Sequence, residues 1–263
     1  MIMPGFSTDG ILLRRIEYGD HDLIITYFTR SMGRISVVAK NAKKSVKRFA
    51  GALDPFSMMN IHCTLPRRKN RLPILASVDL ENPFARIRMD TAKTGYASYW
   101  VELINAWMEQ GKEQTAVYDL LCYVLDALNT GVVEKEVLSL LFQIRFMAIS
   151  GFSPNIASCS SCAVPIDNIP QQQVLFDIQE GGLVCDRCAA KGGSRCNARQ
   201  GILVSKGTLK QLAWINSKEI RKAGTITFPA FAVKEGERLL ESFVPCHIGR
   251  EMKSLVFLQR IRR

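Results

Sequence analysis

Two pairs of cysteines have the spacing of metal ligands. The sequence reads CSSC at 159–162 and CDRC at 185–188, so two Cys-x-x-Cys pairs stand 22 residues apart. Zn²⁺ takes four thiolates in a tetrahedron, and each pair can supply two sulfurs from one tight turn. The sequence therefore predicts a closed, structural zinc site that leaves no coordination position for catalysis, with the ligands Cys159, Cys162, Cys185 and Cys188.

Other uses of these cysteines fit the sequence less well. Buried thiols that happen to lie close together would not explain two paired spacings, and a redox role would need only one pair. The other four cysteines occur singly and are expected to act as small hydrophobic side chains: Cys63, Cys122, Cys196 and Cys246.

A run of positive charge is the second candidate site. The segment from Leu23 to Leu53 has seven Lys or Arg residues and no Asp or Glu, and a second cluster reads RRKNR at 67–71. Because like charges repel and folding does not favour such an excess, the imbalance indicates a polyanionic partner rather than a merely solvated surface. Nucleic acid is the first candidate, with these predicted phosphate contacts: Arg34, Lys40, Lys43, Lys44, Lys47, Arg48, Arg67, Arg68, Lys69 and Arg71.

Aromatic residues near the basic run could stack on bases. Tyr27, Phe28 and Phe49 are the candidates, because stacking on aromatic rings lets a protein bind single strands of any sequence. An aromatic side chain in a strand belongs more often to the core, so a core role is favoured for all three.

Catalytic motifs do not stand out. The sequence has no phosphate-binding Gly-x-x-x-x-Gly-Lys-Ser/Thr loop, no His-Glu-x-x-His and no Gly-x-Ser-x-Gly. The run Asp20-His21-Asp22 could be a metal or acid–base cluster, but a solvated turn before a strand is favoured. We therefore expect no enzyme and no catalytic residue, although a nuclease built from scattered carboxylates remains a third alternative.

The elements that position these sites divide the chain. Residues 7–80 form five strand-like runs. In the fourth run, alternate residues share one face: Met59, Ile61, Cys63 and Leu65. The fifth run is expected to alternate in the same way, with these residues on one face: Ile74, Ala76, Val78 and Leu80. Five short antiparallel strands predict a small barrel, preferably an OB-fold, with an SH3-like barrel as the alternative. In an OB-fold, strands 2 and 3 and the loops joining strands 1–2 and 4–5 make the binding groove, which would place both basic clusters near it.

The rest of the chain has a helical period. Apolar stripes run through 96–107, 117–128 and 133–144. The natural helix stops are Gly111, Gly131 and Gly151, and Ser205 could begin a later helix. The net charges of 1–82, 83–151 and 152–263 are +6, −2 and +7. We predict an α+β protein with these domains: an OB-fold that binds DNA at 1–82, a helical domain at 83–152, a zinc-finger insertion at 153–200 and the C-terminal part of the helical domain at 201–263.

Targeting signals do not appear. No run resembles the roughly 18 apolar residues of a transmembrane helix, and the N-terminal residues lack a charged region followed by an apolar one. We expect a cytoplasmic protein, in which metal ligation suits the cysteines better than disulfides do.

The order of these segments resembles one known family. The run GILLRRIEYGDHDLIITYFTRSMGRISVVAKNAKKSVKRFAGALDPFS, the helical middle, CSSC and CDRC, and the late IGREMKSLVFLQ are similar to the RecO family of bacterial recombination mediators. The resemblance spans nearly the whole chain and implies an OB-fold, a helical domain and an embedded zinc finger. It also implies a nucleoid-associated protein that binds single- and double-stranded DNA and anneals strands without ATP. The implied partners are the C-terminal tail of the single-stranded-DNA-binding protein (SSB), RecR and, indirectly, RecA.

Both lines of reasoning predict the same mechanism. Basic patches can neutralise the phosphates of two strands while leaving the base edges free to pair, so annealing needs no hydrolysis. The principal alternative is a sequence-specific regulator or RNA-binding protein that reads bases with the zinc finger. The finger interval does not support it, because this interval contains Gln171, Gln172 and Gln173 rather than a basic helix.

Overall fold

The protein folds as two compact units in the computed structural model, which describes residues 4–45, 48–49, 51–66, 68, 71–191, 201–224 and 226–262. The first unit holds the N-terminal strands and helices up to Thr130, together with the chain from Phe257 onward. The second unit runs from Gly131 to Val256. The expected α+β class is confirmed, whereas the four domain boundaries stay a prediction.

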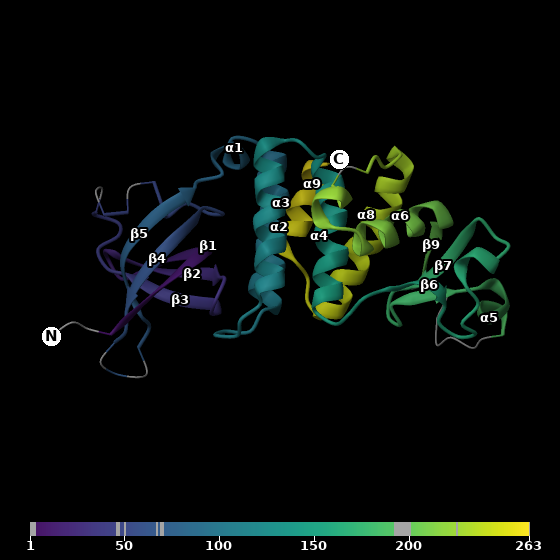
Figure 1. Ribbon diagram of the computed structural model, residues 1–263, viewed down its shortest axis with the longest axis horizontal. Coiled ribbons are helices and arrows are strands. Elements are labelled where there is room, and N and C mark those ends of the chain that lie inside the picture. The colour runs from purple at the N-terminus through teal and green to yellow at the C-terminus, as the bar shows by residue number, and fades with distance from the viewer. Residues whose placement is uncertain are drawn as a thin grey trace. The chain divides into compact units, whose positions relative to one another are not determined.

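The first unit is built around a five-stranded barrel. Its strands close in the order β1-β2-β3-β5-β4, and all neighbours are antiparallel except β3 and β5 (Figure 1). This arrangement matches the expected OB-fold. The barrel strands are β1 (Gly5–Tyr18), β2 (Asp22–Thr29), β3 (Gly33–Ala39), β4 (Met58–Thr64) and β5 (Ile74–Asn82).

The barrel core follows from the alternation of side chains. In β4, Met59, Ile61 and Cys63 point inward and are buried, as predicted, because successive residues of a strand face opposite sides. Leu65 lies beyond the end of β4 and is 41% exposed, so the predicted buried face ends at Cys63.

The prediction for β5 is wrong in its first half. Leu75 is the fully buried residue there, while Ala76 is exposed and Ile74 is half-buried. The pairing shifts from His62↔Ser77 to Cys63↔Leu75, which marks a β-bulge at Ala76. A bulge inserts one residue and reverses the facing of the residues beyond it, so a simple alternation cannot describe the whole strand.

Helices complete the first unit: α1 (Ala85–Arg88), α2 (Thr91–Trp107), α3 (Thr115–Thr130) and the end of α9 (Lys253–Ile261). The side chain of Asp90 begins α2 by accepting a hydrogen bond from the backbone N–H of Lys93 at 3.0 Å. The loop between α2 and α3 lies against the start of β3, where a Cβ on Gly33 would stand 1.9 Å from the carbonyl oxygen of Lys112. Only glycine fits there, and its φ of +60° also favours glycine.

The second unit combines helices with a four-stranded sheet of order β6-β8-β7-β9 (Figure 1). Helix α4 packs against α6 and α8 and is buried along most of its length, as the predicted stripe requires. The elements are α4 (Lys135–Ile149), β6 (Asn155–Cys159), the 3₁₀ helix η1 (Ile166–Asn168), β7 (Gln173–Asp177), β8 (Gly182–Val184), α5 (Asp186–Ala190), β9 (Gly201–Ser205), α6 (Lys206–Ser217), α7 (Ile220–Ala223), α8 (Ala230–Ile248) and the start of α9.

Local signals for the helices are confirmed except at Gly111. Ser205 begins α6, and its side chain accepts a hydrogen bond from the backbone N–H of Thr208. Gly131 and Gly151 lie just after α3 and α4 with positive φ, as expected of helix stops. The prediction is wrong for Gly111, because α2 ends at Trp107 with Met108 as its C-cap. Among the described residues, no helix combines the length and the apolar character needed to cross a membrane.

Candidate metal centre and nucleic-acid interface

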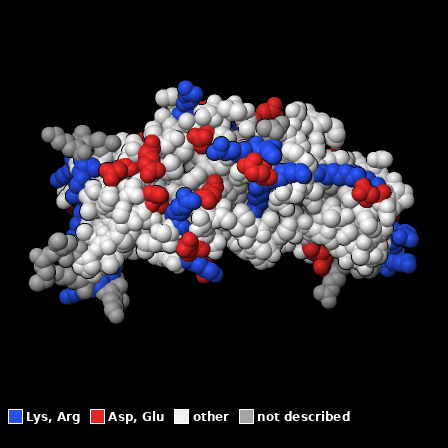
Figure 2. All heavy atoms as spheres, in the orientation of Figure 1, with Lys and Arg blue, Asp and Glu red and all other residues white. Residues whose placement is uncertain are grey.

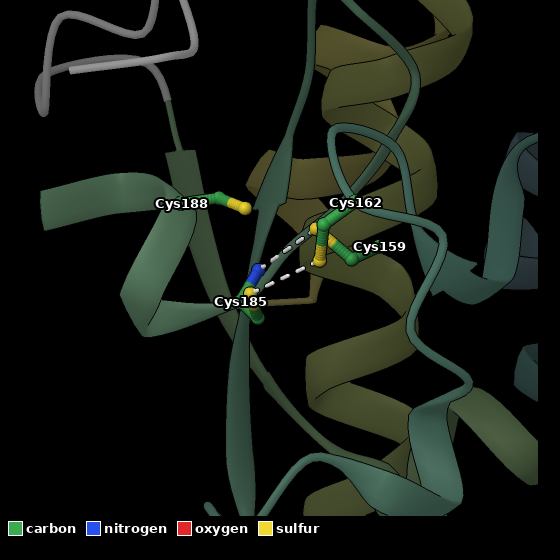
Figure 3. A group of neighbouring side chains, drawn as sticks. All are labelled: Cys159, Cys162, Cys185 and Cys188. Atoms are coloured by element: carbon green, nitrogen blue, oxygen red, sulfur yellow. Dashed lines mark hydrogen bonds between the residues drawn. The ribbon is translucent and has the colours of Figure 1, made fainter. Parts of the chain in front are cut away.

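The four predicted metal ligands lie together in the second unit. The sulfur atoms of Cys159, Cys162, Cys185 and Cys188 are all within 4.8 Å of one another, and their side chains converge (Figure 3). The sulfurs of Cys162 and Cys185 are 3.7 Å apart. Four thiolates around one Zn²⁺, each about 2.3 Å from the ion, would have sulfurs about 3.8 Å apart. The cluster therefore has the ligand type and the dimensions to hold a metal ion of this kind.

Two tight turns bring the ligands together. Cys159 ends β6 and Cys185 follows β8, and these two strands are paired in the sheet. Within the first turn, the backbone N–H of Ala163 donates to the carbonyl of Cys159 at 2.8 Å, and Ala163 has a φ of +58°. Within the second, the N–H of Cys188 donates to the carbonyl of Cys185 at 2.9 Å. Pairing of the strands thus joins two Cys-x-x-Cys turns that are distant in sequence.

Hydrogen bonds favour ionisation of one thiol in the cluster. Burial opposes ionisation of Cys159, but backbone N–H groups, foremost that of Cys185, lower the pKa of this thiol to about 6. The bond from the Cys185 N–H to the Cys159 sulfur is 3.4 Å long (Figure 3). Cys188 shares hydrogen bonds with the sulfurs of Cys162 and Cys185, which raises its pKa to about 12. A bound cation would replace such shared protons, because thiol ligands release protons on binding a metal.

The three other cysteines that the structure describes do not join the cluster. Cys63 is buried in the barrel core and Cys122 is half-buried in α3, in line with the expected role as small hydrophobic side chains. That expectation is wrong for Cys246, which is exposed on α8. Cys196 lies outside the described residues.

The basic segment after β3 is held at its beginning by the β1–β2 hairpin. The backbone N–H of Asn41 donates to the carboxylate of Asp22 at 2.8 Å, and that of Lys43 donates to the carbonyl of His21 at 3.1 Å. The Lys43 ammonium also lies 2.7 Å from the carboxylate of Glu17, and this contact lowers the pKa of Glu17. The run Asp20-His21-Asp22 therefore supports the loop; the described acidic side chains there form no metal-ligand group.

Asp54 holds the end of the same segment. Its carboxylate lies 3.4 Å from the guanidinium of Arg15 on β1 and 3.6 Å from that of Arg88 on α1. Arg88 also donates to the carbonyl oxygens of Pro55 and Pro83, at 3.2 and 2.7 Å. The described residues at the two ends of this segment, Asn41 and Asp54, are thus fastened to the first unit.

The structure separates the predicted phosphate contacts into three groups. Arg34 donates to the carbonyl and side-chain oxygens of Asn105, at 2.7 and 3.3 Å, and Lys43 is paired with Glu17. Both cations are engaged within the protein. Lys47, Arg67 and Lys69 lie outside the described residues. Arg48 is exposed, but it donates to the carbonyl of Lys40 at 2.8 Å. The other exposed members are Lys40, Lys44, Arg68 and Arg71.

The two basic clusters meet at one end of the barrel. The backbone N–H of Val38 donates to the carbonyl of Pro73 at 2.8 Å, which brings the chain after the β4–β5 turn beside the end of β3. Lys40 follows Val38 by two residues, and Arg71 precedes Pro73 by two residues. Figure 2 shows Lys and Arg side chains gathered at the end of the barrel that is farther from α2 and α3.

The hypothesis that Tyr27, Phe28 or Phe49 stacks on bases is contradicted. Tyr27 and Phe28 are 0% exposed and Phe49 is 5% exposed, so the favoured core role is confirmed. Arg48 covers Phe49, with its guanidinium carbon 4.4 Å from the centre of the ring.

Two exposed residues of β1 were missed by the sequence reasoning. Ile16 and Tyr18, 40% and 55% exposed, lie at the end of β1 that leads into the β1–β2 turn. The sequence signal was present, because Arg15, Ile16, Glu17 and Tyr18 alternate charged with apolar side chains. Only the register of the strands shows which of the two faces meets solvent.

Comparison with known proteins agrees with this architecture. Residues 3–84 match the family model described as recombination protein O N terminal, and residues 88–255 match recombination protein O C terminal. The chain is 41% identical to the DNA repair protein RecO of Desulfosudis oleivorans over 261 residues, which cover 99% of each chain. It is 40% identical to RecO of Desulfatibacillum aliphaticivorans, again over 99% of each chain, and 32% identical to RecO of Syntrophus aciditrophicus over 98% of this chain and 96% of that one. The chain therefore belongs to the RecO family of DNA repair proteins.

Proposed function

We propose that this protein is a non-enzymatic recombination mediator that binds single- and double-stranded DNA through the basic end of its barrel. The observation that supports this most directly is the segment from Leu23 to Leu53, which has seven cations and no acidic residue, is held to the β1–β2 hairpin at Asn41, and exposes Lys40 and Lys44. Cations held in this way release counterions from DNA without regard to its sequence. Family membership supports a role in DNA repair.

Annealing follows from the same chemistry. Two complementary strands repel each other through their phosphates, and a basic surface reduces that repulsion while it leaves the base edges free to pair. No ATP is consumed in such a process. In this proposal the protein anneals strands and, with RecR, helps RecA replace SSB on single-stranded DNA, at the nucleoid in the cytoplasm.

We also propose that the four cysteines hold Zn²⁺ in a structural role. The support is the S₄ ligand set at tetrahedral dimensions, which leaves no position open for a substrate. The ion would fasten the β6 and β8 ends of the small sheet.

A groove in the second unit could receive the C-terminal tail of SSB. Its volume is about 400 Å³, which lies within the range of ligand pockets. It is lined by Arg238, Ser242 and Cys246 of α8 and by the apolar side chains of Ile178 and Ile202. A guanidinium next to apolar side chains suits a peptide that is acidic and ends in an apolar residue. The family resemblance supplies this partner, and the groove supplies a place to test it.

A sequence-specific regulator is the less supported alternative. The helix of the finger, α5, has only five residues and one cation, Arg187. A helix that reads the major groove needs several exposed side chains along one face, which α5 is too short to offer.

The test of the proposed function is annealing of complementary oligonucleotides coated with SSB, without ATP. The informative variant is Lys40→Ala with Lys44→Ala, because both lysines are exposed, whereas Lys43 and Arg48 make contacts within the protein. The matched control removes two exposed lysines of the second unit, Lys218→Ala with Lys234→Ala.

The expected result is rapid annealing by the wild type and the control and slow annealing by the barrel variant. For single strands, the slope of log affinity against log salt concentration should also become less steep by about 1.4 in the barrel variant, which is about 0.7 for each of the two lost phosphate contacts. Equal loss in the control would move the DNA site to the second unit. A folded, zinc-loaded wild type that does not anneal would contradict the mediator function.

A further inference from the structure

The outer surface of the barrel carries an apolar row across four strands. The register pairs Ile16 of β1 with Ile24 of β2, Ile24 with Val38 of β3, and Val38 with Ile74 of β5. Paired residues of neighbouring strands lie side by side on the same face of a sheet. Ile16 is 40% exposed and the other three are half-buried, so the row is open to solvent.

Polar and aromatic residues border this row. On one side Arg14 pairs with Thr26 and Thr26 with Ser36, and the two hydroxyl oxygens are 3.2 Å apart. On the other side lies Tyr18, 55% exposed, at the end of β1 and paired with Asp22. Apolar side chains and an exposed ring thus lie next to each other on one face.

The remainder of the outer β2–β3 face is covered. Phe28 lies under Tyr118 of α3, with ring centroids 6.0 Å apart, and Arg34 is held by Asn105 of α2. These helices leave open the part that begins at Thr26 and Ser36 and ends at the β1–β2 turn.

The charged residues around the open part of this face indicate which kind of ligand binds there. The cations Arg14 and Lys40 lie at its edges and are exposed. Of the nearby acidic groups, Asp22 accepts the N–H of Asn41, Glu17 is paired with Lys43, and Asp20 lies in the turn. Glu17 also pairs with Leu23, which packs against the barrel core, so its side chain belongs to the opposite face from Ile16 and Tyr18. An apolar surface with a cationic edge suits a ligand with flat apolar groups and negative charges.

We propose that this surface is a base-stacking site for single-stranded DNA. Unpaired bases lie on the Tyr18 ring and on the row of Ile16, Ile24 and Val38, while Arg14 and Lys40 contact the phosphates. The assignment rests on the proposed function and deepens it, because it names the form of DNA that this face selects. Bases stacked within a duplex have no free faces to offer, so the contact favours single strands.

The test compares Tyr18→Leu with Tyr18→Phe, which keeps the ring. The matched control is Phe231→Leu, another exposed aromatic residue, at 58%, on α8 of the second unit. Each protein is titrated with oligo(dT), with a duplex of the same length, and with a single strand that contains 2-aminopurine, whose fluorescence falls when the base stacks on a ring.

We expect Tyr18→Leu to bind oligo(dT) about 5-fold or more weakly and to lose the 2-aminopurine quenching. Duplex binding and the salt slope should change little, because no phosphate contact is removed. Tyr18→Phe and Phe231→Leu should behave as the wild type does.

The outcomes distinguish this site from the proposed function. If Tyr18→Leu binds and quenches like the wild type while Lys40→Ala with Lys44→Ala loses DNA, the stacking site is wrong and the basic DNA surface stands. A protein partner for the apolar row would then become the better explanation. If neither variant changes binding, the barrel is not the DNA site and both proposals fail.

Discussion

Glu235 on α8 accepts two hydrogen bonds from Ser205, one from the backbone N–H at 3.0 Å and one from the hydroxyl at 2.7 Å. Its carboxylate also accepts the hydroxyl of Thr208 at 2.6 Å. The start of α6 is therefore joined to α8 by one charged group. Burial opposes ionisation of Glu235, but the bonds from Thr208 and Ser205 outweigh it and lower the pKa of the carboxyl.

This joint predicts a stability that depends on pH. Because the pKa of Glu235 is lowered on folding, its contribution is present above the ordinary value of 4.5 and is lost as the pH falls through the folded pKa. Glu235→Gln should lower the free energy of unfolding of the second unit by about 1 to 2 kcal/mol at pH 7. Urea denaturation at pH 7 and below pH 4.5 checks this. The difference in free energy of unfolding between the wild type and Glu235→Gln should become smaller in acid. A difference that stays constant across that pH range would contradict the role of the Glu235 charge. The exposed control Glu180→Gln should not lose stability to the same extent, and an equal loss there would contradict it as well.

The first cysteine turn carries a backbone penalty at Ala163. Its φ of +58° lies in the left-handed region, which costs a residue with a Cβ about 1 kcal/mol relative to glycine. Ala163→Gly should therefore stabilise the second unit by about that amount, as measured by thermal unfolding of the zinc-loaded protein. The control Ala157→Gly, at an exposed position in β6 without positive φ, should destabilise the unit. The account is wrong if both variants shift the melting temperature in the same direction.

Metal analysis checks the zinc proposal. We expect one Zn²⁺ per chain in the wild type and in Cys246→Ser, whose cysteine lies outside the cluster. Cys185→Ser should lose the metal and lower the thermal stability of the second unit, because a structural ion contributes directly to folding. A chelator should produce the same effect on the wild type. Full metal content in Cys185→Ser would refute the four-ligand site.

Tyr27 places a hydroxyl in the barrel core, where no described residue offers it a hydrogen bond. Burial raises the pKa of this phenol, in agreement with its dry surroundings. Tyr27→Phe removes the unpaired group and should leave the barrel equally stable or more stable by about 1 kcal/mol. Tyr27→Leu should instead destabilise it, because a void replaces the ring. Chemical denaturation measures both, and a clear loss in Tyr27→Phe would mean that the hydroxyl has a partner in solution.

Arg238 is the charged side chain that we expect to bind the tail of SSB in this groove. A fluorescent peptide that is acidic and ends in an apolar residue should bind Arg238→Ala about 10-fold more weakly than the wild type, because a charged hydrogen bond is lost. Lys234→Ala, one turn earlier on α8, should have a much smaller effect. Fluorescence anisotropy at two salt concentrations provides the measurement. Unchanged affinity in Arg238→Ala would exclude this groove as the tail site.

Local patterns predicted much of this fold. Cysteine spacing predicted which four cysteines cluster because each pair lies within one turn, and the alternation in β4 and the helical stripes predicted the buried faces. These features depend on residues that are close in sequence, where the geometry of strands and helices determines which side chains share a face. The same reasoning failed at Ala76, where a bulge changes the facing of β5.

Long-range packing decided which candidates remain available to a ligand. Arg34 looked like a phosphate contact until α2 placed Asn105 beside it, 71 residues away, and Phe28 was covered by Tyr118. Conversely, Ile16, Ile24 and Val38 read as ordinary strand residues, and only the register between three strands joins them into one row on the outer face. Sequence pattern thus specified the elements and the cysteine cluster. The pairing of strands and the docking of helices determined which surface stays open, because exposure depends on neighbours that are remote along the chain.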